Sequence, residues 1–139
     1  MLFKKYNVFK QKKKVIKVIF TIYIIAFLIG TITHIIDIIN FGFLGYPNSP
    51  MLLNIYWTSL TFFDPLAVLL LIFYPFMGLI FSGVIMISNV GVNMSRALFY
   101  YFKEGYPIGY KEICQLLFLI FLFFTIKYCW KKIKEDCIK

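Results

Sequence analysis

The sequence predicts an all-α integral membrane protein, and three observations support that prediction. Hydrophobic residues make up 61% of the 139 residues and charged residues only 15%, whereas soluble domains are about half apolar and a quarter charged. The apolar residues form runs long enough to cross a bilayer core of ~30 Å as helices. Lysine clusters flank these runs at both ends of the chain. We therefore expect a single transmembrane domain, residues 1–139, built as a four-helix bundle.

The first predicted span, residues 18–39, follows a lysine-rich segment, as the apolar part of a secretory signal does. The run is too long for a signal and lacks a small-residue cleavage site, so we expect an uncleaved anchor. The next stretch, NFGFLGYPNSP, is rich in Gly, Pro and Asn and predicts a loop. Within it, Ser49 and Pro50 are typical of a helix N-cap followed by proline at the first helical position.

The second and third spans are fused in one apolar stretch, residues 51–94, in which Asp64 is the single charged residue. A continuous helix of that length would be ~66 Å long, which no bilayer needs. Pro75 and Gly78 place a turn in the sequence YPFMG. The predicted spans are therefore residues 50–73 and 76–95.

An alternative interpretation makes Asp64 the N-cap of one long helix that starts at Pro65, with residues 50–63 re-entrant. That arrangement leaves three spans and places the basic C-terminal segment outside the cell. Because basic segments are retained on the cytoplasmic side, the four-span interpretation is favoured.

The fourth predicted span is residues 113–130, after a polar and aromatic connector at residues 96–112. Basic segments at residues 1–17 and 131–139 then both lie in the cytoplasm, and the first loop, which has no Lys or Arg, lies outside. These features predict a multi-pass protein of the cell membrane, plasma or inner. The position of the lysines indicates that the net charge of +9 sets the orientation in the membrane and attracts anionic lipid headgroups. We therefore do not expect nucleic-acid binding.

Metal, cofactor and catalytic motifs are not apparent in the sequence. The three cysteines have no metal-ligand spacing, and the chain has a single histidine. We therefore expect no cofactor and no metal, and we favour a function other than catalysis.

The polar side chains of the spans lie at mid-depth or toward the external side, and the inner half is almost wholly apolar. An aspartate at the bilayer centre costs ~2.5 to 3.5 kcal/mol on insertion scales. Such groups should therefore face inward, and we expect His34, Asp64 and Asn89 to approach one another. The candidate ligand-binding residues are His34, Asp37, Trp57, Thr61, Asp64, Asn89 and Asn93.

Structural roles compete with ligand binding at several of these positions. Hydrogen bonding between helices is the favoured role of Asn89 and Asn93, and packing is the default role of Trp57. Both roles stay open for His34. Asp64 is the exception, because its depth favours a functional role.

The residues around Asp64 predict an acceptor site. Pro65 has no N–H, so the carbonyl of Thr61 loses its helical partner beside the carboxylate. Trp57, Thr61 and Asp64 share a helix face, as do His34 and Asp37. The site should hold a proton or accept a positively charged or hydrogen-bonding ligand.

The segment HIIDIINFGFLGYP…YW…FFDPL resembles the first two helices of the EXPERA, or emopamil-binding, group of membrane proteins, and is most similar to its sigma-2 receptor branch. The resemblance covers residues 33–67, in which the positions of Asp37, Trp57 and Asp64 are similar to those of an aspartate, a tryptophan and an Asp-Pro-Leu sequence in that branch. The third span departs from the pattern, since asparagines stand where an acidic residue is expected. The sequences WTSLTFFDPLA and VGVN also resemble a type of small, uncharacterised bacterial four-helix membrane protein.

Together these features predict binding of a small amphipathic or lipid-like molecule, for example a cationic amphiphile, with Asp64 as polar anchor and Trp57 as aromatic wall. A second hypothesis is an accessory subunit whose polar face is covered by a membrane-protein partner. A third is a small transport or proton-relay unit that uses His34, Asp37 and Asp64. The apolar inner half makes the third hypothesis the weakest.

Overall fold

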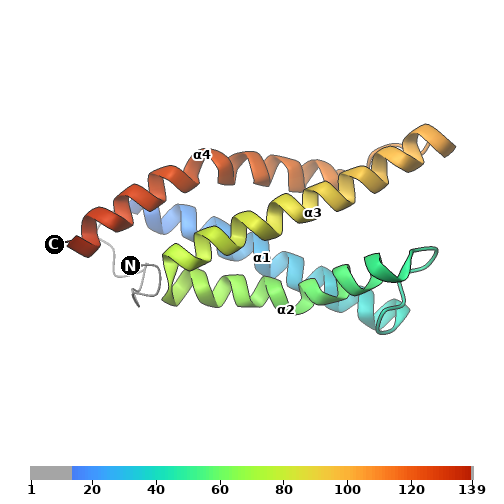
Figure 1. Ribbon diagram of the computed structural model, residues 1–139, viewed down its shortest axis with the longest axis horizontal. Helices are drawn as coiled ribbons and strands as arrows, with labels where there is room; N and C mark the ends of the chain where they lie inside the picture. The colour runs from blue at the N-terminus through green and yellow to red at the C-terminus, as the bar shows by residue number, and fades with distance from the viewer. Residues whose placement is uncertain (1–13, 139) are drawn as a thin grey trace. The chain divides into compact units, whose positions relative to one another are not determined.

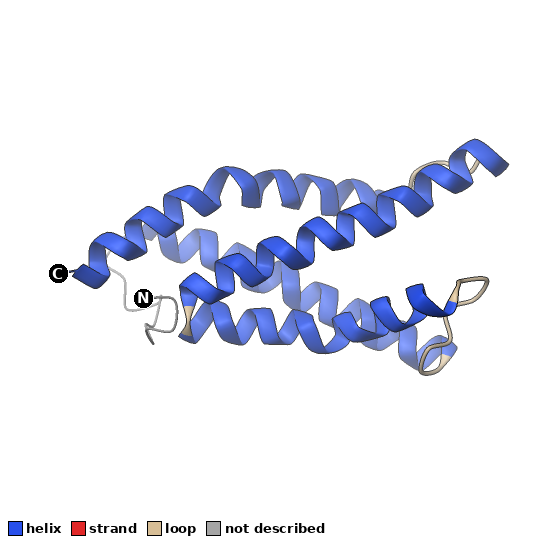
Figure 2. Cartoon of the chain, in the orientation of Figure 1, coloured by secondary structure: helices blue, strands red, loops and turns tan. Residues whose placement is uncertain are grey.

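The computed structural model describes residues 14–138, with side chains described as far as Glu135. It contains four helices, which are α1 (Lys14–Phe41), α2 (Met51–Phe73), α3 (Pro75–Glu104) and α4 (Tyr110–Ile138) (Figure 1). Short connections join the helices, and no strand occurs within the described range (Figure 2). Most of the basic N-terminal segment, residues 1–13, and Lys139 lie outside that range.

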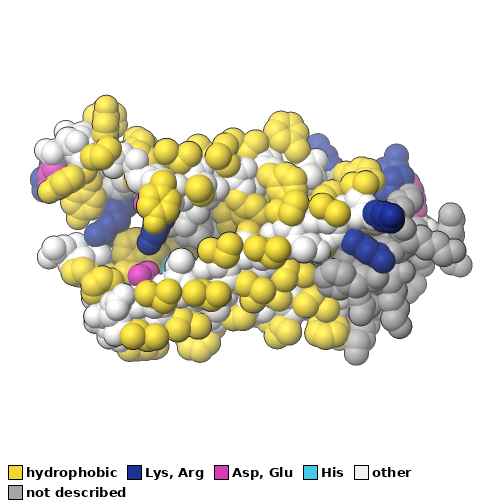
Figure 3. Space-filling model, turned by 180° about the vertical axis from the view of Figure 1, so that it is seen from behind, with side chains coloured by type: hydrophobic (Ala, Val, Ile, Leu, Met, Phe, Trp, Pro, Cys, Tyr) yellow, Lys and Arg dark blue, Asp and Glu magenta, His cyan; other side chains and the backbone are white. Residues whose placement is uncertain are grey.

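All four helices are long and apolar enough to cross a membrane, with α4 qualifying over Tyr110–Glu135. Their lengths of 23 to 30 residues correspond to ~35 to 45 Å of helix. Large apolar side chains are exposed along every helix, and hydrophobic side chains cover much of the face in Figure 3. Because water disfavours such a surface, these features suggest a multi-pass membrane protein.

The chain divides into two compact units, one ending at Gly78 and the other starting at Leu79. In the first unit, α1 and α2 pack against each other along their lengths and are joined by the loop at residues 42–50. The buried side chains of α1 recur every three or four residues, which places them in one stripe of the helix. They are Ile16, Ile19, Phe20, Tyr23 and Phe27.

Helix α2 is continuous through Pro65, and Asp64 lies in its interior. The alternative in which Asp64 caps a helix is therefore not seen. The expected cap at Ser49 is wrong as well, because no side chain caps α2 and the Ser49 hydroxyl instead donates to the carbonyl of Pro47 at 3.1 Å. Pro50 begins the hydrogen bonding of the helix, since its carbonyl accepts from the backbone of Leu53 and Asn54.

A very tight connection joins α2 to α3. Tyr74 alone separates the two helices, and its N–H donates to the carbonyl of Leu70 at 2.7 Å. Pro75 then opens α3, a position where its missing N–H costs nothing. A Cβ on Gly78 would lie 2.5 Å from the backbone nitrogen of Leu71, so only glycine fits this close approach.

In the second unit, the connector expected at residues 96–112 is largely helical. Helix α3 continues to Glu104 and α4 starts at Tyr110, because polar residues can end a membrane span without ending a helix. The α3 helix stops at Gly105, which has a φ of 75° and donates its N–H to the Tyr101 carbonyl at 3.0 Å. This is the left-handed C-terminal geometry that glycine favours.

Candidate functional site

Asp64 is buried in the first unit, with only 3% of its surface exposed. It lies ~20 Å along α2 from Met51, near the middle of the helix. Its Oδ1 atom is fully buried and has no hydrogen-bond partner among residues 14–138. Because a buried polar atom normally has a partner, this carboxylate is the strongest indication of a site.

Gly30 of α1 provides the space that the Asp64 side chain occupies. A Cβ built on Gly30 would lie 2.5 Å from Oδ2 of Asp64 and 3.4 Å from its carboxyl carbon. Any other side chain at residue 30 would therefore collide with the carboxylate. Sequence reasoning missed Gly30, although a lone glycine inside an apolar helix often has a packing reason.

A row of polar side chains runs along α2 from the loop end of the helix to Asp64. Asn54, Thr58, Thr61 and Asp64 are spaced four, three and three residues apart, which places them on one face; we call them the polar stripe. One buried oxygen of each has no partner within the described part of the chain. The other buried hydroxyl in this condition is that of Ser82 on α3, in the second unit.

Trp57, Thr61 and Asp64 lie on one side of α2, as their spacing predicted. Trp57 is 7% exposed, and its ring contacts the ring of Tyr46, with centroids 5.0 Å apart and planes inclined by 54°. The loop residue Tyr46 thus covers the tryptophan that was expected to form an aromatic wall.

Tyr46 also contacts the two remaining candidate residues of the first unit, which are His34 and Asp37. Its hydroxyl lies 3.1 Å from Nδ1 of His34 and is hydrogen-bonded to Asp37. Burial chiefly, and then the charge of Asp37 and the hydrogen bond to it, raise the pKa of the Tyr46 hydroxyl. The hydroxyl therefore stays protonated and donates to the carboxylate of Asp37, which leaves the Nδ1–H of His34 as the donor to Tyr46.

The position of Tyr46 depends on a loop whose geometry the sequence did not reveal. Leu44 and Asn48 both have positive φ, 58° and 54°, and a positive φ is uncommon for residues other than glycine. The one signal for Tyr46 was the sequence GYP, which is too short to separate from chance.

Asn89 and Asn93 belong to the second unit and form an amide chain there. The Nδ2 of Asn93 donates to Oδ1 of Asn89 at 2.8 Å and to Oε1 of Gln115 on α4 at 2.9 Å. This geometry links α3 to α4 through side chains. The expected approach of Asn89 to His34 and Asp64 stays a prediction.

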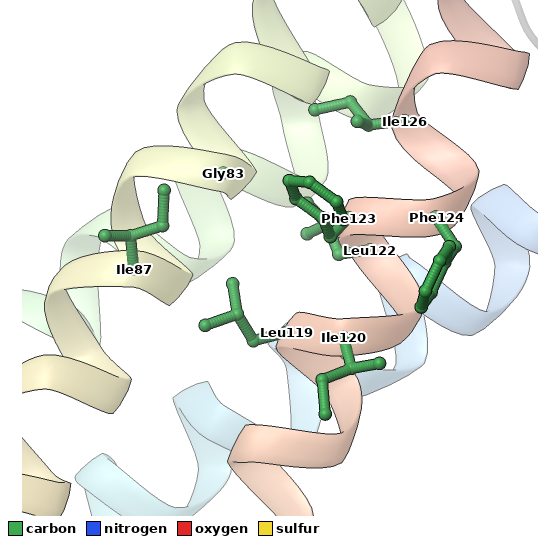
Figure 4. Close-up of a pocket in the computed structure, with 8 residues that line it drawn as sticks. All are labelled: Gly83, Ile87, Leu119, Ile120, Leu122, Phe123, Phe124 and Ile126. Atoms are coloured by element: carbon green, nitrogen blue, oxygen red, sulfur yellow. The ribbon is translucent and has the colours of Figure 1, made fainter.

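The second unit also has a groove of about 560 Å³ between α3 and α4. Figure 4 shows its lining, in which Gly83 and Ile87 of α3 lie opposite apolar side chains of α4. None of the candidate site residues lines it, so the groove offers apolar contact without a polar anchor. The α4 residues of the lining are Leu119, Ile120, Leu122, Phe123, Phe124 and Ile126.

Among the described residues, no group of three or more His, Cys, Asp or Glu side chains could hold a metal ion.

Comparison with protein-family models, with curated proteins and with solved structures finds no match to this chain.

Proposed function

We propose that this chain is a multi-pass protein of the cell membrane that binds a small amphipathic or lipid-like molecule beside α2. Both termini lie in the cytoplasm, as the lysine clusters favour. Asp64 serves as the polar anchor of the ligand, and the loop at residues 42–50 lies on the external side of the membrane.

The observation that carries this proposal is the buried Oδ1 of Asp64, which lacks a partner among the described residues. A buried carboxylate oxygen costs free energy unless a donor or a cation satisfies it. A ligand with a cationic head and an apolar tail supplies both the missing donor and contacts suited to a lipid-facing helix. Gly30 supports the same conclusion, because it leaves space for the carboxylate at the junction of α1 and α2.

A through-going transport path has less support. Beyond Asp64, the buried residues of α2 are Ala67, Val68 and Leu71, which are all apolar. The polar stripe of this helix therefore ends at mid-depth. This is compatible with a binding site, whereas a path across the membrane would need polar groups beyond Asp64.

Thermal unfolding in detergent tests the proposal, with a long-chain alkylammonium ion as probe and a neutral alcohol of the same chain length as control. We expect the cation to raise the melting temperature of the parent protein. Asp64→Asn keeps the shape of the side chain and removes its charge, so the shift should disappear. Glu104→Gln, at the exposed end of α3, is the matched control and should keep the shift.

Two results would exclude the charged anchor. One is an equal shift for the parent and for Asp64→Asn. The other is the absence of any shift in the parent at probe concentrations that leave the detergent micelles unchanged.

A further inference from the structure

The apolar groove between α3 and α4 continues toward the C-terminal end of α4. A second hollow, of about 300 Å³, is lined by Ile126, Lys127 and Trp130, and Ile126 also lines the groove. Ile126 and Trp130 are four residues apart, as are Phe123 and Lys127, which places both hollows on one side of α4. The groove, which has no polar side chain of its own, therefore has a lysine and a tryptophan at one end.

The length of this combined surface matches one leaflet of a bilayer. From Leu119 to Trp130, α4 rises by ~16 Å, and half of a hydrocarbon core of ~30 Å is ~15 Å. Figure 4 shows that the groove extends from Ile87 and Leu119 to Gly83 and Ile126. An extended acyl chain that belongs to one leaflet therefore fits along it.

The α3 side of the groove is open because Gly83 has no side chain. A Cβ on Gly83 would meet only the Cδ1 of Ile126 at 3.9 Å. Apolar side chains flank this space, since Ile87 is 65% and Phe123 is 67% exposed. The protein thus leaves a strip of apolar surface that an acyl chain can contact from both helices.

Lys127 gives one end of the groove a positive charge. Its side chain is exposed, and no ion pair of the described residues includes it. Tryptophan is enriched at the level of the lipid headgroups, and a lysine near the end of a span extends toward the same level. Basic pockets between helices on the cytoplasmic side of membranes bind anionic headgroups, so Lys127 and Trp130 together suit such a headgroup.

A second copy of the chain fits this surface less well. In an isologous interface the same patch lies on both partners, so Lys127 would approach the like charge of its counterpart. No Asp or Glu lines the groove or the hollow, so the same surface offers no carboxylate to offset that repulsion. The charge therefore favours an anionic lipid as the occupant.

We propose that the groove between α3 and α4 holds one acyl chain of an anionic phospholipid, whose phosphate lies against Lys127 beside Trp130. The site lies in the second unit and takes a headgroup of the opposite charge to the ligand proposed at Asp64, so it does not depend on that ligand. With the end of α4 in the cytoplasm, the lipid belongs to the cytoplasmic leaflet, where anionic lipids are abundant.

Fluorescence of Trp130 tests the site in reconstituted vesicles. The chain contains two tryptophans, so Trp57→Phe leaves Trp130 as the single reporter in the parent protein and in every variant. The vesicles contain equal amounts of phosphatidylglycerol and phosphatidylcholine, and one lipid or the other carries bromine on its acyl chains, which quenches a tryptophan that it contacts. The ratio of the two quenching efficiencies reports which lipid lies beside Trp130, whichever way the protein is inserted.

We expect a preference for phosphatidylglycerol on the order of fivefold, the effect of one lysine beside an anionic lipid. Lys127→Gln should remove the preference. Lys134→Gln, at an exposed position farther along α4 that does not line the hollow, is the matched control and should retain it.

Two results of this comparison would overturn the proposal. One is the absence of a preference in the parent protein. The other is an equal loss in Lys127→Gln and Lys134→Gln, because the attraction would then belong to the basic end of α4 as a whole and not to a site.

Gly83→Leu tests the position of the acyl chain. The new side chain fills the groove, so the preference should fall as it does in Lys127→Gln. Gly91→Leu is the matched control on the same helix, because Gly91 is exposed and an added Cβ would meet nothing within 4 Å. An unchanged preference in Gly83→Leu would refute occupancy of the groove. If Gly83→Leu folds poorly, Ile87→Gln places an amide in the lining at an exposed position and should act in the same direction.

Light scattering in detergent distinguishes a second copy from a lipid. We expect the parent protein and Gly83→Leu to have the same protein mass. A dimer that Gly83→Leu converts to a monomer would overturn the proposal, because the groove would then be filled by protein.

Discussion

Gly30 of α1 and Asp64 of α2 fit together so closely that a single added carbon on the glycine would lie 2.5 Å from a carboxylate oxygen. Neither residue is required by helix formation, since glycine disfavours helices by ~1 kcal/mol relative to alanine and a mid-membrane aspartate is costly. Their pairing indicates that the carboxylate is held in a defined position against α1.

Gly30→Ala should lower the stability of the protein by about 1 to 3 kcal/mol, because overpacking forces the carboxylate or the helix to move. Gly83→Ala is the matched control, since its Cβ would meet only the Cδ1 of Ile126 at 3.9 Å. That change should be neutral or stabilising through helix propensity. Thermal unfolding in detergent measures both, and equal destabilisation by the two alanines would contradict the contact.

A double-mutant cycle isolates the pair. Asp64→Ala removes the group that collides with the new methyl, so Gly30→Ala should cost much less in that background. The difference is the coupling between the two sites, which is typically 0.5 to 3 kcal/mol for residues in contact. Additive effects would show that Gly30 acts elsewhere in the fold.

The sequence predicted Asp64 as the central residue but not its partner. Hydropathy and helix rise give the depth of a residue in a span, whereas the face that α1 turns toward α2 depends on how the two helices pack. Gly30 could have been suspected as the one glycine inside α1, but its contact required the structure. The same limit applies to Asn93, for which hydrogen bonding between helices was the favoured role but the partner Gln115 was not predicted.

Tyr46 shows a second limit of the sequence. Its contact with His34 spans twelve residues and depends on a loop with two non-glycine residues at positive φ. Composition identifies such a segment as a loop, but it does not specify the path of the backbone. The helix bounds were easier to anticipate, because Pro75 and Gly78 mark the connection that Tyr74 forms.

Asn93 and Gln115 should stabilise the contact between α3 and α4 by a small amount. Double-mutant cycles of such pairs in membranes average ~0.6 kcal/mol, so we expect a coupling of that size between Asn93→Ala and Gln115→Ala. Asn93→Ala should cost more than Gln115→Ala, because it also removes the bond to Asn89. Zero coupling in this cycle would contradict a stabilising contact between Asn93 and Gln115, because each side chain would then lose the other without a cost in stability.

The topology can be measured with reporter fusions. A fusion that ends at Asn48 and one that follows Lys139 should report opposite sides of the membrane, with the C-terminal reporter in the cytoplasm. The physical reason is the lysine excess at both ends of the chain and the absence of Lys and Arg from the first loop. Reporters on the same side would support three spans and place the polar stripe in a different orientation.

Tyr46→Phe should weaken the attachment of the loop to α1. The change removes the hydroxyl that contacts His34 and Asp37, and the loss of these hydrogen bonds should lower the stability by ~1 to 3 kcal/mol. Tyr110→Phe, with a ring that is 74% exposed at the start of α4, is the control and should change stability little.

Alkaline pH provides a second test of the same hydroxyl. The pKa of Tyr46 is raised in the folded protein, so its contribution to stability is complete below the ordinary tyrosine value of ~10. The contribution decreases as the pH rises above that value, because the unfolded chain then loses the proton that the folded chain retains. The stability difference between the parent and Tyr46→Phe should therefore be constant at neutral pH and narrow above pH ~10. Unfolding of both proteins at a series of pH values measures this difference. A stability difference that increases at alkaline pH would contradict the hydrogen bond to Asp37.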